Sequence, residues 1–96
     1  MAGWLVERRL SQNAARLKSL RAELVQLDEQ YDLFASDADD SAIRALVSET
    51  PGAAFEANDA RRHAHAMARH RQHVVDTIGE LERKQDELLD KLTSKR

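Results

Sequence analysis

Apolar residues in the first and last thirds of the chain recur in alternating steps of four and three residues. In the first third, the series consists of Val6, Leu10, Asn13, Leu17, Leu20, Leu24, Leu27, Tyr31 and Phe34. In the last third, it consists of Ala64, Met67, Arg71, Val74, Ile78, Leu81, Gln85, Leu88 and Leu92. This spacing places one stripe along each of two helices. When the second series is read backwards against the first, the residue numbers of every pair add up to the same total. The pattern predicts an all-α fold, a long antiparallel helical hairpin of the coiled-coil type.

Each series contains one amide side chain, and the predicted pairing sets the two opposite each other. These residues are Asn13 and Gln85. Amides in an apolar seam must bond each other, and a slipped alignment would place an amide against leucine. We therefore predict that Asn13 and Gln85 set the register of the hairpin.

Charged side chains near the seam supply two further expectations. Arg71 occupies a seam position, from which its long side chain can carry the guanidinium to Asp28 or Asp32. On one flank of the seam, Arg21 can lean towards Glu82. Exposed ion pairs contribute only about 0.2–1 kcal/mol each, so the apolar seam should decide the register.

Helix boundaries are predicted from residues that favour or break helices. The first helix should span residues 4–35 and end at Ser36-Asp37, because both side chains compete for backbone hydrogen bonds. A short helix over residues 40–48 should follow. Thr50 followed by Pro51 marks the start of a third helix over residues 51–93, since the first helical position does not use the donor that proline lacks.

The short helix should thicken the closed end of the hairpin. The third helix begins with a face of small residues, formed by Ala53, Ala57, Ala60 and Ala64. A face of alanines allows another backbone to approach closely. We expect the short helix to occupy this face with larger apolar residues, namely Ile43, Leu46 and Val47, together with Phe55.

Composition limits the class of protein. The chain has 96 residues, of which 33% are charged and 4% aromatic, and this favours one helical domain over residues 1–96. The chain has no cysteine, which excludes disulfides, thiolate metal sites and cysteine nucleophiles and fits a reducing cytoplasm. No stretch has the apolar length of a membrane span, and no signal peptide is recognisable. We expect a cytoplasmic protein that binds no cofactor.

A second apolar stripe on one flank of the hairpin favours self-association. Val75 and Leu89 lie on this flank with the small residues Ala14 and Ala68. A two-helix seam is a small core for a chain of this length. Burial of the flank against a second copy would form a homodimeric four-helix bundle. The alternative is a monomer with ordinary scattered surface hydrophobic residues.

Residues 61–75 form an arginine- and histidine-rich band that contains no acidic residue. An outer line on the helix, interrupted by Asp76, holds Arg62, Arg69 and Arg83, with His63, His70 and His73 beside it. Such a line can contact the phosphates of RNA or DNA, or an acidic protein surface. The net charge of −2 and the lack of aromatic residues in the band argue against nucleic acid. We prefer a solvated charged face.

The histidines also raise the question of a metal site. His70, His73 and Asp76 follow one another at intervals of three residues, so a helix brings two imidazoles and a carboxylate to one side. Zinc or iron can use such ligands. The interleaved arginines place positive charge where a cation would bind, and the chain lacks the Glu-x-x-His motif of di-iron bundles. We therefore expect no metal, with these three residues as the candidate ligands if one binds.

Acidic residues gather at the predicted closed end, namely Asp37, Asp39, Asp40, Glu49 and Glu56. A hairpin with an acidic tip resembles the coiled-coil domain of Gre-type transcript-cleavage factors, which inserts its tip into RNA polymerase. The resemblance covers the hairpin only, and it implies that the acidic tip reaches into the active site of a partner or binds a basic surface. We prefer the interpretation that these acids cap short helices.

The remaining features point away from catalysis. Trp4 stands at the open end, where it can cover the core or anchor a partner. The sequence shows no phosphate-binding loop and no catalytic constellation. It predicts a small non-enzymatic interaction module that acts through protein–protein contact. The alternative is a factor associated with nucleic acid, RNA polymerase or the ribosome through the Arg/His band and the acidic tip. A helical metal-binding protein comes third.

Overall fold

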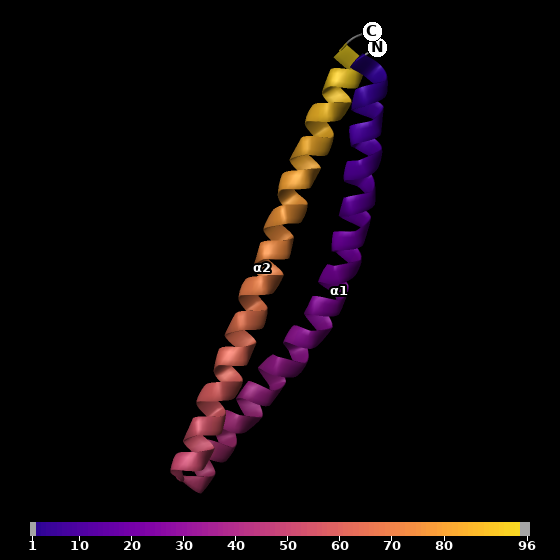
Figure 1. Ribbon diagram of the computed structural model, residues 1–96. Coiled ribbons are helices and arrows are strands. Elements are labelled where there is room, and N and C mark those ends of the chain that lie inside the picture. Colours follow the sequence, from indigo (N-terminus) through magenta and orange to yellow (C-terminus); the bar gives the residue numbers. More distant parts are fainter. Residues whose placement is uncertain (1, 95–96) are drawn as a thin grey trace. The chain divides into compact units, whose positions relative to one another are not determined.

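Two long α-helices form almost all of the described chain. The computed structural model describes residues 2–94, in which α1 spans Ala2–Ser48 and α2 spans Pro51–Ser94 (Figure 1). Every described residue outside the turn at residues 49–50 is helical. The all-α helical hairpin predicted from the sequence is confirmed.

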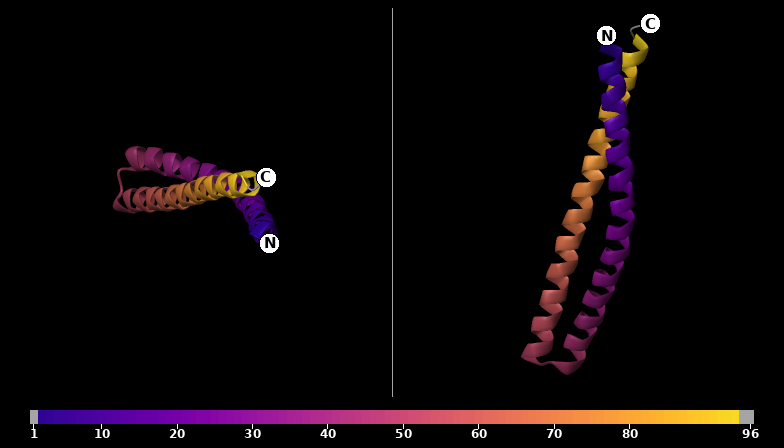
Figure 2. Two further views of the ribbon diagram at one scale, coloured as in Figure 1. Left: turned by 90° about the horizontal axis from the view of Figure 1, so that it is seen from above. Right: turned by 45° about the vertical axis from the view of Figure 1, so that its right-hand side comes forward.

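Contacts divide the chain into two compact units, each with one segment from α1 and one from α2. Of the described residues, unit 1 contains 2–24 and 73–94, and unit 2 contains 25–72. Unit 2 includes the turn that connects the helices. Around this turn the last residues of α1 and the first of α2 lie side by side in Figure 1 and in both views of Figure 2.

The turn is built from local caps. Glu49 adopts a left-handed conformation with φ of 50°, and its N–H donates to the carbonyl of Ala45 at 3.1 Å, which closes the end of α1. The hydroxyl Oγ1 of Thr50 accepts a hydrogen bond from the N–H of Ala53 at 3.2 Å. Pro51 is the first residue of α2. The helix start predicted at Thr50 and Pro51 is therefore confirmed.

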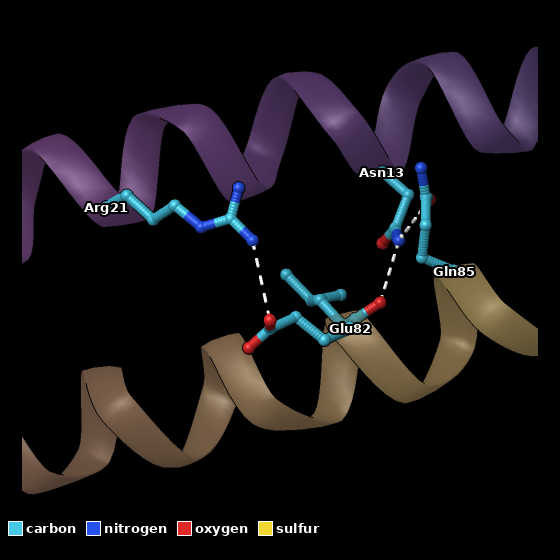
Figure 3. Close-up of polar contacts among 5 residues, drawn as sticks. Asn13, Arg21, Glu82 and Gln85 are labelled. Atoms are coloured by element: carbon cyan, nitrogen blue, oxygen red, sulfur yellow. Dashed lines mark hydrogen bonds and ion pairs between the residues drawn. The ribbon is translucent and has the colours of Figure 1, made fainter.

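Unit 1 has the predicted register. Asn13 donates from Nδ2 to Oε1 of Gln85 at 2.8 Å and to the carbonyl oxygen of Leu81 at 2.9 Å. Arg21 and Glu82 form the expected ion pair at 3.5 Å, as Figure 3 shows. The buried apolar residues of unit 1 all belong to the two predicted series: Val6, Leu17, Val74, Ile78 and Leu88.

The amide pair gives a first testable prediction. Replacing Asn13 with Leu should destabilise unit 1 by about 1–2 kcal/mol, because the half-buried Gln85 side chain loses its donor. The double variant N13L/Q85L should recover this loss, since apolar side chains then replace both amides. Urea denaturation of the single and double variants measures both effects.

The double variant also tests whether the amides set the register. Spin labels at the exposed residues Lys18 and Glu80 report how the two helices of unit 1 are aligned. We expect one narrow distance distribution in the wild type and a broader one in N13L/Q85L, because slipped pairings no longer bury an amide. An unchanged distribution in the stable double variant would contradict the register-setting role.

Unit 2 departs from the expectation at its closed end. Helix α1 continues through Ser36 and Asp37 and through the predicted short helix over 40–48, so the predicted break is wrong and no separate third helix forms. The steps of four and three residues continue in α1, and the small seam residues there are Ala38, Ser41 and Ala45. Their partners in α2 are Ala60, Ala57 and Ala53, and all six are buried or half-buried. Packing of this seam outweighs the weak helix propensity of Ser and Asp, which amounts to less than about 0.7 kcal/mol each.

A charged contact holds the other end of unit 2. Arg71 donates from Nε to Oδ1 of Asp28, as the sequence predicted. This hydrogen bond, together with the negative charge of Asp28, raises the pKa of the Arg71 guanidinium. Nearby, the rings of Phe34 and His63 meet edge to face, with centroids 6.1 Å apart and planes at 81°.

Candidate protein-interaction surface

Small side chains fill the seam of unit 2 near the turn, whereas large apolar side chains lie outside it. Ser41 and Ala60 are 4% and 7% exposed. The large residues expected to cover the alanine face are instead between 60% and 80% exposed, namely Ile43, Leu46, Val47 and Phe55. The alanine face packs against the seam side of α1, so the prediction that a separate short helix covers it with large apolar residues is wrong. Burial follows position in the seam rather than side-chain size.

Helix geometry explains why these residues face outward. Ile43 lies two positions from both Ser41 and Ala45, and two positions turn an α-helix by about 200°. Leu46 and Val47 follow Ile43 at intervals of three and four residues, so the three side chains form one exposed stripe on α1. The stripe is continuous rather than scattered.

Two carboxylates adjoin this stripe. Asp39 and Asp40 precede Ile43 by four and three residues, which places them one turn back on the same outer side of α1. Both are exposed and lie in the interior of α1, so the expectation that they cap a short helix is wrong. We call the five residues Asp39, Asp40, Ile43, Leu46 and Val47 the tip surface.

Phe55 lies on a different side of unit 2. It is two positions from both Ala53 and Ala57, so it faces outward from α2, away from α1. The two outer sides of unit 2 therefore carry different chemistry. Phe55 is followed on its own side by Arg62 and Arg69, both exposed.

The turn adds further acidic character beside the tip surface. Glu49 and Glu56 are exposed, and α1 has no basic residue in its last turn. Arg44, the basic residue nearest the tip surface in the sequence, donates from Nη2 to Oγ of Ser41 at 2.9 Å. Glu49 occupies a left-handed backbone conformation that is common just after the C-terminus of a helix.

The Arg/His band is split between the two units. Unit 2 holds Arg62, Arg69, His63 and His70, all exposed, whereas unit 1 holds His73, Asp76 and Arg83. Arg61 donates from Nη2 to Oδ1 of Asn58, and Arg71 is bound to Asp28. A shallow, mainly apolar hollow interrupts the band and is lined by Phe34, His63, Ala66, Met67 and His70.

The described residues show neither a metal-binding cluster nor a membrane-spanning segment. Within residues 2–94, no group of three or more His, Asp or Glu side chains is placed to hold a metal ion. The candidate ligands His70, His73 and Asp76 therefore do not form such a group. Neither α1 nor α2, over the residues described, contains a segment with the length and apolarity of a bilayer crossing.

The other predicted contact residues lie in unit 1. Trp4 is 57% exposed. Leu89 is exposed and Val75 is half-buried, so the flank predicted to mediate dimerisation presents less apolar surface than the tip surface does.

The residues of the tip surface were predicted to cap a short helix or to pack against the alanine face, and both predictions are wrong. The sequence signal that could have found this arrangement is the continued spacing of Ala38, Ser41 and Ala45 beyond the predicted break.

Comparison of the chain with models of protein families, with curated proteins and with solved structures found no match.

Proposed function

We propose that this chain is a small non-enzymatic helical module that binds a protein partner through the tip surface. The observation that carries the proposal is the inverted burial in unit 2, with small residues inside and Ile43, Leu46 and Val47 outside. Burying one such side chain contributes about 1.5–3 kcal/mol. A continuous exposed apolar stripe is typical of an interaction site, whereas single exposed apolar residues are not.

The architecture supports a binding role over catalysis. The described pockets are open hollows between neighbouring side chains of two helices, and a substrate site normally encloses most of its ligand. Coiled-coil packing of the seam and a cytoplasmic location belong to the same proposal.

Site-specific photo-cross-linking in the native cell tests the proposed function. A photoreactive residue at Val47, which is 80% exposed, should yield a discrete adduct with another protein. The same residue at the exposed position Lys18 in unit 1 is the control and should yield no such adduct. Leu46→Ser should weaken the Val47 adduct severalfold, because the partner loses an apolar contact. Equal adducts from both positions would contradict the proposal.

Other outcomes would support the predicted alternatives. An adduct of twice the chain mass, lost in Leu89→Ser, would indicate the homodimer through the Val75 and Leu89 flank. Binding of a labelled RNA that falls steeply with salt and is lost in the double variant R62A/R69A would indicate a nucleic-acid partner. The exposed arginines of α2 are the observation that keeps this second function in view.

A further inference from the structure

The charge around the tip surface restricts what can cover it. Along α1 in unit 2, the positions before Ile43 hold the exposed acids Glu29, Asp32, Asp39 and Asp40 and no basic residue, although Asp32 lies near Arg71 of α2 and Asp39 lines a hollow that also contains Arg61 of α2. Glu49 follows the stripe at the turn. The apolar stripe is therefore bordered by negative charge at both of its ends. Complementary charge at the rim of an interface favours the correct partner and repels others.

A second copy of the chain fits this surface poorly. Two α1 helices packed outer side to outer side in parallel would bring the same carboxylates together, and an antiparallel pair centred on Ile43 would place Asp39 and Asp40 of one copy against the apolar residues of the other. If instead α2 of a second copy followed the pairing of the internal seam, Phe55 would face Ile43, but Asp59 would face Asp39. That contact would also be heterologous, so it would not close into a dimer. An anionic membrane surface would be repelled by the same acids.

We infer that the tip surface binds an α-helix of another protein. That helix carries an apolar stripe, and Lys or Arg side chains lie one helical turn from the stripe on the same side of the helix. The inference rests on the proposed function and adds the kind of partner. The apolar residues of that helix cover Ile43, Leu46 and Val47. Its basic residues lie against Asp39 and Asp40. Helix-on-helix packing of this kind adds a third helix to unit 2.

Selection from a displayed library of helical peptides tests the inference. Each peptide has about five helical turns and carries a fixed stripe of Leu, and the positions one turn from the stripe vary among Lys, Glu, Gln and Ala. The full chain is the bait. We expect Lys to be enriched at the varied positions and the selected peptides to lose affinity with rising salt.

Two bait variants separate the contributions. Leu46→Ser should reduce the affinity of the selected Lys peptides about tenfold, because the peptide loses its apolar contact with the leucine side chain. The charge reversal D39K/D40K should also reduce their affinity about tenfold and should enrich Glu peptides in a repeated selection. Leu89→Ser, which changes an exposed leucine of unit 1, is the matched control and should leave affinity unchanged.

The outcomes distinguish this inference from the proposed function. Enrichment of Glu, Gln or Ala peptides that still require Leu46 would overturn the basic partner and leave the proposed function standing. The helix-docking inference would be overturned if Leu46→Ser left the affinity of the selected peptides unchanged, or if no peptide bound the wild-type bait more tightly than the Leu46→Ser bait. The cross-linking at Val47 would then decide the proposed function alone. A chain that self-associates through Phe55, detected by sedimentation of Phe55→Ser, would identify a second copy as the occupant and likewise overturn the inference.

Discussion

Replacing Leu17 with Ala should lower the free energy of unfolding by about 2–3 kcal/mol. Leu17 is 4% exposed and lies in the seam of unit 1. The substitution removes buried apolar surface and leaves a cavity. A seam of two helices is open to solvent on both flanks and can partly collapse, which places the loss at the lower end of the usual range for Leu→Ala. Small domains have total stabilities of only about 5–15 kcal/mol, so urea denaturation should show a large shift.

Leu5→Ala is the matched control for this prediction. It is the same substitution in the same unit, but Leu5 is 46% exposed, so we expect a loss below about 1 kcal/mol. Hydrogen exchange of L17A should increase first in residues 2–24 and 73–94, the segments of unit 1. Equal losses in the two variants would show that the residue at position 17 is not a seam residue.

The register of the hairpin could be predicted from the sequence because one spacing rule repeats along both helices. Any slip would move the amide of Asn13 away from Gln85. The same pairing brought Arg21 to Glu82 and Arg71 to Asp28, and both contacts are present.

The closed end could not be predicted in the same way, because two local rules pointed in the wrong direction. Ser36 and Asp37 have low helix propensity, and this indicated a break. Large apolar residues are usually buried, and this assigned Ile43 and Leu46 to the core. Both rules were overridden by the small seam residues, which let α1 continue against α2. Alanine and serine carry too weak an apolar signal to extend a stripe when the sequence is read alone.

The candidate site was hidden for the same reason. Exposure of the tip surface depends on which side of α1 packs against α2. The predicted short helix was oriented with Ile43, Leu46 and Val47 towards α2, whereas these residues face outward. The acidic residues can be identified from the sequence, but their structural surroundings cannot. The acids at 39 and 40 were recognised, but their place beside an apolar stripe depends on the continuous helix.

Replacing Ser41 with Leu should destabilise unit 2 by about 2–3 kcal/mol, because the larger side chain overfills a seam built for small residues. Ser41 is 4% exposed. Ser41→Ala should change stability by less than about 1 kcal/mol, since only the hydrogen bond from Arg44 is lost and that guanidinium can be hydrated. Thermal unfolding followed by circular dichroism measures both variants.

The same Ser→Leu change at Ser36 is the matched control, because Ser36 is an exposed residue of the same helix. It should leave stability within about 0.5 kcal/mol of the wild type. The contrast decides which side of α1 packs. If S41L were tolerated and Leu46→Ser were destabilising, Leu46 would be the buried residue, and the tip surface would lose its apolar stripe. If S41L destabilises as expected, it should also weaken the cross-link from Val47, although it changes no residue of the tip surface, because the seam holds that surface in place.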